Sequence, residues 1–293
     1  MSFILKGICS EGSFRFSIID SKTIVARAAD IHSCSAVAAA ALGRTLTAAS
    51  LMGNMMKEEA ASLMIRINGG GPLGSIIAVS DSCGNVRGYA DNPQIELPSK
   101  EKGKLDVGRA VGKDGFVTVS RDIGLKEPYV GSTKLVSGEI AEDMAQYLAE
   151  SEQTESAIGL GVLISSGEIL SAGGFLIQLL PGASLEVIEK LEENIKNMPP
   201  VTTVLFENDA YELVNILTGG FEAEILTREE VSYKCTCSRQ KTTDALISCG
   251  EVELKDMILK GEDVEVGCIF CDEKQIFTSE EVCEILEGLK KAE

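Results

Sequence analysis

The chain has 293 residues, of which 44% are hydrophobic and 25% are charged. Asp and Glu number 45 against 27 Lys and Arg, and this negative charge repels polyphosphate, so we expect no nucleic-acid partner. The first residues lack the pattern of a signal peptide and no stretch reads as a membrane span, so we expect a globular, cytoplasmic protein with no membrane partner.

The first part of the chain predicts an α+β domain with many short strands. Residues 14–19 and 23–28 predict two strands joined by a turn. Residues 33–56 are rich in Ala and carry Leu42 and Leu46 at helical spacing, which predicts a long, mostly buried helix. Further strands are expected at 62–67, 75–79, 85–90, 116–120, 131–136, 158–164 and 174–180, and a helix at 139–149. We therefore expect residues 1–182 to form a mixed α/β core domain with a largely antiparallel sheet.

Residues 183–230 differ in composition and predict a helical linker. An amphipathic helix is expected at 184–197, where Leu185, Ile188 and Leu191 lie on one stripe. A second helix is expected at 209–217, where Gly219 and Gly220 follow as a C-cap would. Because the apolar face of this segment is narrow, we expect the linker to have no core of its own.

Residues 231–293 predict a small C-terminal domain that contains two close pairs of cysteines. The pairs are Cys235-Thr236-Cys237 and Cys268-Ile269-Phe270-Cys271. Four thiolates at this spacing form the ligand set of a closed tetrahedral Zn²⁺ site, so we expect one Zn²⁺ per chain in the reduced state. A thiol redox pair without metal is the alternative. The metal ligands and redox-sensitive residues are then Cys235, Cys237, Cys268 and Cys271.

Short elements are expected around these cysteines. Helices are predicted at 244–249 and 251–259, and a hairpin at 263–266 with 275–278. Thr278 and Glu281 stand at the spacing of a capping box before a final helix. About sixty residues with so little apolar mass form a marginal core. We therefore expect the metal to supply much of the stability of this domain.

The remaining motifs do not favour catalysis. Gly69-x-Gly71-x-x-Gly74 matches a dinucleotide fingerprint, but Pro72 lies inside it and a strand follows, so it predicts a hairpin turn. No phosphate-binding G-x-x-x-x-G-K-[ST] motif occurs, and His32 is the only histidine. We expect no catalytic residue, no bound organic cofactor and no enzymatic activity.

Methionines and additional cysteines have plain structural explanations. Met52, Met55, Met56 and Met64 could offer adaptable apolar surface to varied ligands, but core filling is the simpler reading. Nine cysteines in a chain expected in a reducing compartment argue against a disulfide framework. Those outside the two pairs are expected to be small buried or surface residues: Cys9, Cys34, Cys83, Cys249 and Cys283.

Several short stretches accompany the two cysteine pairs in a fixed order. They are Gly71-Pro72-Leu73-Gly74, Val86-Arg87-Gly88-Tyr89, Ser137-Gly138-Glu139-Ile140-Ala141-Glu142-Asp143, Ser151-Glu152-Gln153, Ala172-Gly173-Gly174 and Leu180-Pro181-Gly182. With these stretches and the cysteine pairs, the chain resembles the redox-regulated 33-kDa heat-shock chaperonin family over nearly its whole length.

The resemblance implies an ATP-independent holdase that is inactive when reduced and bound to zinc. It implies that oxidative stress, usually with heat, converts the four cysteines to two disulfides, Cys235 with Cys237 and Cys268 with Cys271, and expels zinc. The linker then unfolds, and apolar surface binds unfolding client proteins, commonly in a homodimer. Two alternatives stay open at this point: a thiol-disulfide oxidoreductase and a zinc-stabilised adaptor protein.

Overall fold

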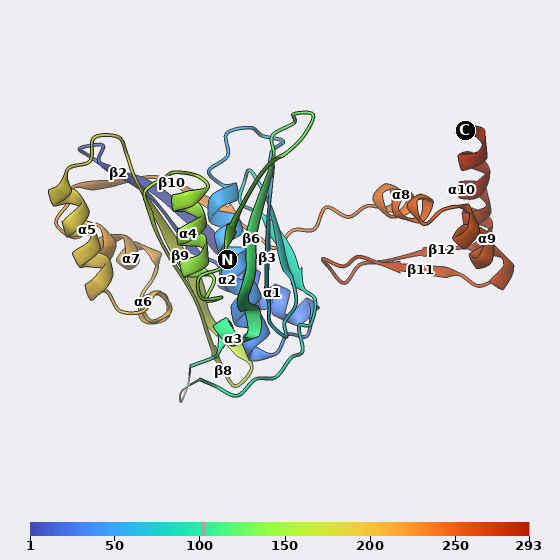
Figure 1. Ribbon diagram of the computed structural model, residues 1–293, viewed down its shortest axis with the longest axis horizontal. Helices are drawn as coiled ribbons and strands as arrows, with labels where there is room; N and C mark the ends of the chain where they lie inside the picture. The colour runs from blue at the N-terminus through green and yellow to red at the C-terminus, as the bar shows by residue number, and fades with distance from the viewer. Residues whose placement is uncertain (101–103, 293) are drawn as a thin grey trace. The chain divides into compact units, whose positions relative to one another are not determined.

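The computed structural model describes residues 1–100 and 104–292 (Figure 1). The chain divides into two compact units, Met1–Lys234 and Cys235–Glu293. The α+β class with antiparallel sheets and a long buried helix is confirmed. The segment 183–230, expected to be a linker, belongs to the first unit. The division into a core domain, a linker and a C-terminal domain therefore stays a prediction about how these parts behave.

Two antiparallel sheets form the frame of the first unit. In the described residues, one has the strand order β10-β1-β2-β9-β8 and the other β5-β4-β3-β6-β7. The strands of the first sheet are β1 (Ser2–Cys9), β2 (Phe14–Asp20), β8 (Ser156–Ser165), β9 (Glu168–Leu179) and β10 (Ala223–Val231). Those of the second sheet are β3 (Ser62–Gly70), β4 (Ile76–Asp81), β5 (Val86–Ala90), β6 (Gly112–Asp122) and β7 (Tyr129–Lys134).

The helix α2 (Ala36–Gly53) lies between the two sheets and forms the centre of the larger core (Figure 1). It begins after Ser35, whose hydroxyl oxygen accepts a hydrogen bond from the backbone N–H of Ala38. By length and composition this helix could cross a membrane, which the sequence pattern did not indicate. However, 89% of it is buried inside the unit, as in the core helix of a folded protein.

The expected strand at 23–28 is wrong, because these residues form part of the helix α1 (Lys22–Ile31). Ile24, Val25 and Ala28 are buried on one face of α1, and packing of this face outweighs the strand propensity of the two branched residues. The sequence pattern also does not reveal β1 or β10, which pair with each other along their length. The other helices before residue 183 are α3 (Val107–Val111) and α4 (Ala141–Glu150).

Three helices of the segment 183–230 share a second core with the first sheet. They are α5 (Leu185–Asn197), α6 (Val201–Glu207) and α7 (Ala210–Leu217). Phe14, Phe16 and Phe175 of the sheet are nearly fully buried in this core, whereas Leu176 belongs to the core around α2. The helices therefore cover the face of the first sheet opposite α2. Lifting them would expose a large aromatic surface.

The second unit has a small core of its own. Its elements are α8 (Arg239–Cys249), α9 (Glu251–Lys260), β11 (Val264–Gly267), β12 (Lys274–Phe277) and α10 (Ser279–Ala292). Among its described side chains, the buried apolar residues are Leu246, Leu254, Phe277, Val282 and Leu286. The capping box is confirmed: the N–H of Thr278 donates to the Glu281 carboxylate at 2.9 Å, and the N–H of Glu281 to the Thr278 hydroxyl at 3.3 Å. A core of this size needs a further source of stability.

Asp143 organises the loop that enters α4. Its side chain is fully buried and accepts hydrogen bonds from the backbone N–H groups of Val136, Ser137, Gly138 and Ile140 at 2.7–3.3 Å. Ile140 has a φ of 69°, a conformation that a branched side chain rarely adopts. The carboxylate thus stabilises a strained turn that local sequence preference alone would not form.

Replacement of Asp143 by alanine tests this role. The variant leaves four backbone donors without their charged acceptor, so we expect its unfolding free energy to fall by about 3 kcal/mol or more. Urea unfolding followed by circular dichroism measures the change. The neighbouring variant Glu142→Ala is the control, since Glu142 is exposed and its loss should cost less than about 0.5 kcal/mol. Equal losses in the two variants would contradict the assignment.

Candidate metal centre

Two tight segments of the second unit carry the four paired cysteines. Cys235 and Cys237 lie just before α8, whose first turn is capped by the hydroxyl of Ser238. Cys268 and Cys271 lie in the turn between β11 and β12. In this turn the N–H of Cys268 donates to the carbonyl of Glu273 at 3.1 Å, and the strands pair in antiparallel register on both sides. Hairpin geometry therefore fixes one pair, and the start of α8 fixes the other.

The four sulfur atoms converge on one point. All four Sγ atoms lie within 4.8 Å of one another. Cys235 and Cys268 are 3.6 Å apart between sulfur atoms, and Cys237 and Cys271 are 3.5 Å apart. Sulfur atoms bound tetrahedrally to Zn²⁺ at about 2.3 Å are separated by about 3.8 Å. The donor set and its spacing thus fit a metal ion of this kind, and the side chains predicted from the sequence come together.

The pKa values of Cys237, Cys268 and Cys271 are shifted in different directions. Burial raises the pKa of Cys268, but hydrogen bonds from the backbone of Phe270 and Cys271 and from nearby thiols outweigh it, so this pKa is lowered. Burial raises the pKa of Cys237 and of Cys271, and neighbouring sulfur atoms raise that of Cys271 further. Of these three thiols Cys268 therefore ionises first, and its negative charge opposes ionisation of the next. Four thiolates together require a cation, which is the chemistry of a metal site.

Two cations support the cysteine segments from α8. Lys241 donates from Nζ to the carbonyl of Thr236 at 2.9 Å, between the first two cysteines. The guanidinium of Arg239 lies 4.3 Å from the ring centroid of Phe277 and pairs with Glu281. These contacts tie the first cysteine pair to the small core. Neither residue belongs to a recognised motif, although two cations so close to a cysteine pair in an acidic chain are a usable signal.

The residues just before Cys235 are anchored to the edge of the second sheet. The N–H of Val86 donates to the carbonyl of Ser232, and the N–H of Lys234 donates to the carbonyl of Val86, both at 3.0 Å. The hydroxyl of Tyr233 donates to the carbonyl of Gly88 at 2.9 Å. We call residues 232–234 the strap. It extends the β5 edge within the first unit and ends one residue before the first cysteine.

His32 contacts both the strap and the edge strand that the strap follows. Its Nε2 lies 2.9 Å from the carbonyl oxygen of Gly88 and 3.4 Å from the hydroxyl of Tyr233. Burial lowers its pKa, although the contact with Gly88 opposes this effect. The histidine stands at the C-cap position of α1 and contacts the strap through Tyr233. Sequence patterns do not predict this contact, because His32 and Tyr233 are 201 residues apart.

Comparison with known proteins gives consistent results. A family model described as "Hsp33 protein" matches residues 2–278. A protein named 33 kDa chaperonin from Clostridioides difficile is 46% identical, over 98% of this chain and 99% of its own. One from Bacillus cereus is 39% identical over 98% and 99%. The crystal structure of a 33 kDa chaperonin from Thermotoga maritima, 38% identical, superposes with a TM-score of 0.91 and covers 99% of both chains.

A single serine substitution tests whether the four sulfur atoms hold a metal. Cys271→Ser removes one thiolate from a site that fills all four positions with sulfur. We expect about one zinc per chain in the reduced parent and an affinity reduced by more than about tenfold in the variant. Atomic emission after dialysis against a graded chelator measures the metal. Limited proteolysis should then cut within 230–241 more readily, because this segment loses its anchor.

Cys283→Ser is the matched control for this experiment. Cys283 lies in the same unit, is exposed and does not belong to the sulfur cluster. Its replacement should leave zinc content and protease resistance unchanged. A zinc content far below one per chain in the reduced parent protein would show that the four cysteines do not form a zinc site. Equal losses of zinc in the two variants would show the same.

Proposed function

The chain belongs to the Hsp33 family, whose curated relatives are named chaperonins, and we propose that it is a chaperone controlled by the redox state of Cys235, Cys237, Cys268 and Cys271. The observation that carries the proposal is the convergence of four sulfur atoms in a unit with a very small apolar core. When bound, Zn²⁺ supplies the positive charge that holds four thiolates together. The reduced state is then the closed, inactive one.

Oxidation acts on the ligands themselves. Each pair of thiolates gives two electrons to one molecule of hydrogen peroxide, which takes up two protons from solvent and is reduced to two molecules of water as one disulfide forms. We propose that Cys235 bonds to Cys237 and Cys268 to Cys271. Chain proximity supports this pairing, since each pair is close in sequence and stays close when the unit unfolds. A disulfide sulfur no longer carries the charge that binds a cation, so the unit loses its main source of stability.

The proposed client-binding surface is the aromatic core under α5, α6 and α7. These helices cover Phe14, Phe16 and Phe175 and have no core independent of the first sheet. The strap joins the first unit directly to Cys235. We infer that loss of structure after Cys235 frees the strap and destabilises the segment 183–230. Uncovered apolar side chains would then bind unfolded or partly unfolded proteins.

Several further features belong to the same proposal. The sequence contains no G-x-x-x-x-G-K-[ST] loop for ATP phosphates. We therefore propose that the chaperone holds its clients without ATP-driven cycles of binding and release. We propose that it works in the cytoplasm as a non-enzyme, that the oxidised form is a homodimer, and that neither nucleic acid nor membrane is a partner.

The decisive experiment compares the reduced and oxidised forms of the full chain. Peroxide at elevated temperature should release about one zinc per chain, and the oxidised protein should suppress light scattering by a thermally unfolding client several-fold better than the reduced one. Mass spectrometry should find the two near-neighbour disulfides. If reduced protein protects the client equally well, the switch is absent. Catalytic turnover of a disulfide substrate would instead indicate an oxidoreductase, and binding to a partner while reduced would indicate an adaptor.

The strap provides a second test through Tyr233→Phe. This substitution removes one hydroxyl that bonds to Gly88 and leaves the apolar ring, so the strap should weaken by about 1 kcal/mol. We expect peroxide to activate the variant at a lower temperature than the parent. Hydrogen exchange at Val86 should also be faster. Tyr211→Phe on α7 is the control, since Tyr211 is 42% exposed. An unchanged activation temperature for Tyr233→Phe would show that the strap does not restrain the switch.

A further inference from the structure

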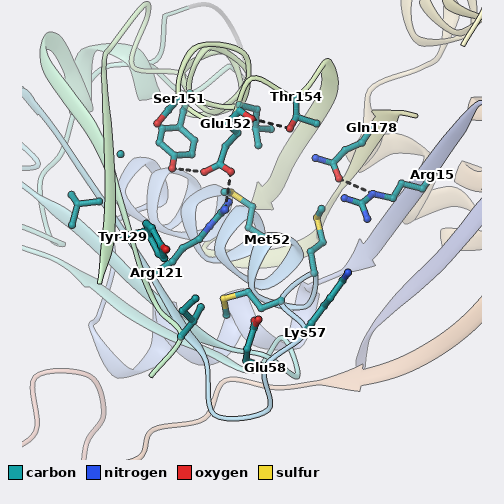
Figure 2. Close-up of a pocket in the computed structure, with 17 residues that line it drawn as sticks. Arg15, Met52, Lys57, Glu58, Arg121, Tyr129, Ser151, Glu152, Thr154 and Gln178 are labelled. Atoms are coloured by element: carbon teal, nitrogen blue, oxygen red, sulfur yellow. Dashed lines mark hydrogen bonds and ion pairs between the residues drawn. The ribbon is translucent and has the colours of Figure 1, made fainter. Parts of the chain in front are cut away.

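A cavity of about 590 Å³ lies in the first unit, at the end of α2 (Figure 2). Arg15 on β2 and Gln178 on β9 border one side, and Arg121 on β6 and Tyr129 on β7 border the other. The volume is in the range of sites for small organic ligands, which is about 300–1,000 Å³. None of the four paired cysteines lines this cavity.

Methionine side chains form much of the apolar wall. Met52 is 3% exposed and lies in the floor, and Met55 and Met56 follow it as half-buried residues beyond the end of α2. The sequence favoured core filling for these residues, and this holds for Met52. Unbranched thioether chains adapt to ligands of irregular shape, so Met55 and Met56 make this wall suited to a flexible apolar chain.

The charges of the cavity are unbalanced. Glu152 is neutralised within the wall, because it accepts from the Tyr147 hydroxyl at 2.6 Å and pairs with Arg121 at 2.7 Å. Arg15 donates from Nε to the neutral Gln178 at 2.9 Å. Lys57 pairs with no carboxylate in the part of the chain that the structure describes.

After these pairings, two cations remain against one exposed acid, Glu58. The whole chain carries a formal charge of −18. A positive cleft in such a molecule concentrates anions locally.

Arg15 and Lys57 also border an adjoining cavity of about 370 Å³, together with Met55, Met56 and Gln178. The unbalanced cations thus lie where the two hollows meet, beside the methionine wall. Glu152 bonds to both Tyr147 and Arg121, and Arg15 bonds to Gln178, whereas the Nε of Arg121 is buried without a partner among the described residues. This unpaired buried donor suits an acceptor such as a carboxylate, while the peptide N–H groups of a ligand would find few free acceptors here, and unpaired amides are costly to bury. An alkyl chain has no such groups.

We propose that this cavity binds a medium-chain carboxylic acid of the fatty-acid class. Its carboxylate pairs with Arg15 and Lys57, and its alkyl chain lies along Met52, Met55 and Met56. The site belongs to the first unit and does not depend on the cysteines. Binding is therefore expected in the reduced, zinc-loaded protein, and it can be tested whether or not the proposed redox control holds.

The experiment is isothermal titration of the reduced full chain with decanoate below its micelle concentration. We expect one decanoate per chain, and no saturable binding of acetate, decanol or decyltrimethylammonium. The double variant Arg15→Met with Lys57→Met should bind decanoate about tenfold more weakly or worse. Methyl resonances of Met52, Met55 and Met56 should shift on addition of decanoate.

The control variant is Lys22→Met with Lys190→Met, which removes the same charge from α1 and α5, outside the cavity. It should bind decanoate as the parent does, and all variants should keep the circular dichroism spectrum of the folded parent. Equal binding of decanol or of the cationic analogue, equal losses in both double variants, or no binding at all would each overturn the proposal. Competition by a Leu-terminated peptide with a free carboxylate, but not by its amide, would overturn the fatty-acid assignment in favour of a chain terminus.

Discussion

Four sulfur atoms that converge within 4.8 Å cannot all carry negative charge without a cation among them. The rest of the second unit depends on this constraint. Its core consists of a few apolar side chains around Phe277, which is too little to stabilise sixty residues. A metal ion bound at the sulfur cluster would supply the missing stability, and thiolates of the kind that bind a cation are also the groups that an oxidant attacks. In the proposed function, stability and sensitivity to oxidation therefore have one chemical origin.

The covalent chain connects the sulfur cluster directly to the first unit. Residues 232–234 extend the edge of β5 and are followed at once by Cys235. β10 directly precedes this strap and pairs with β1. The helices α5, α6 and α7 come before β10 in sequence and cover the aromatic face of the first sheet. The segment 183–234 therefore consists of parts that have little stability by themselves, while the body around α2 has a large core of its own.

Local patterns predict much of this architecture, because the responsible contacts are close in sequence. Alternating side chains identify β3, β4 and β5, and the capping box of Thr278 and Glu281 begins α10 as expected. The pattern fails at α1, where packing of Ile24, Val25 and Ala28 overrides strand propensity. The sequence pattern does not predict β10, because its many charged residues are untypical of a strand. Only its pairing with β1 shows that it is an edge strand.

The sequence by itself identified the four cysteines that converge, the acidic charge and the fold class, because residue type and short spacing carry that information. Only the tertiary structure showed that Tyr233 bonds to Gly88, that His32 supports this contact, and that Arg15 and Lys57 stand beside three methionines. The physical reason is distance along the chain. These groups come from segments up to 201 residues apart, and their proximity results from the packing of two sheets around α2.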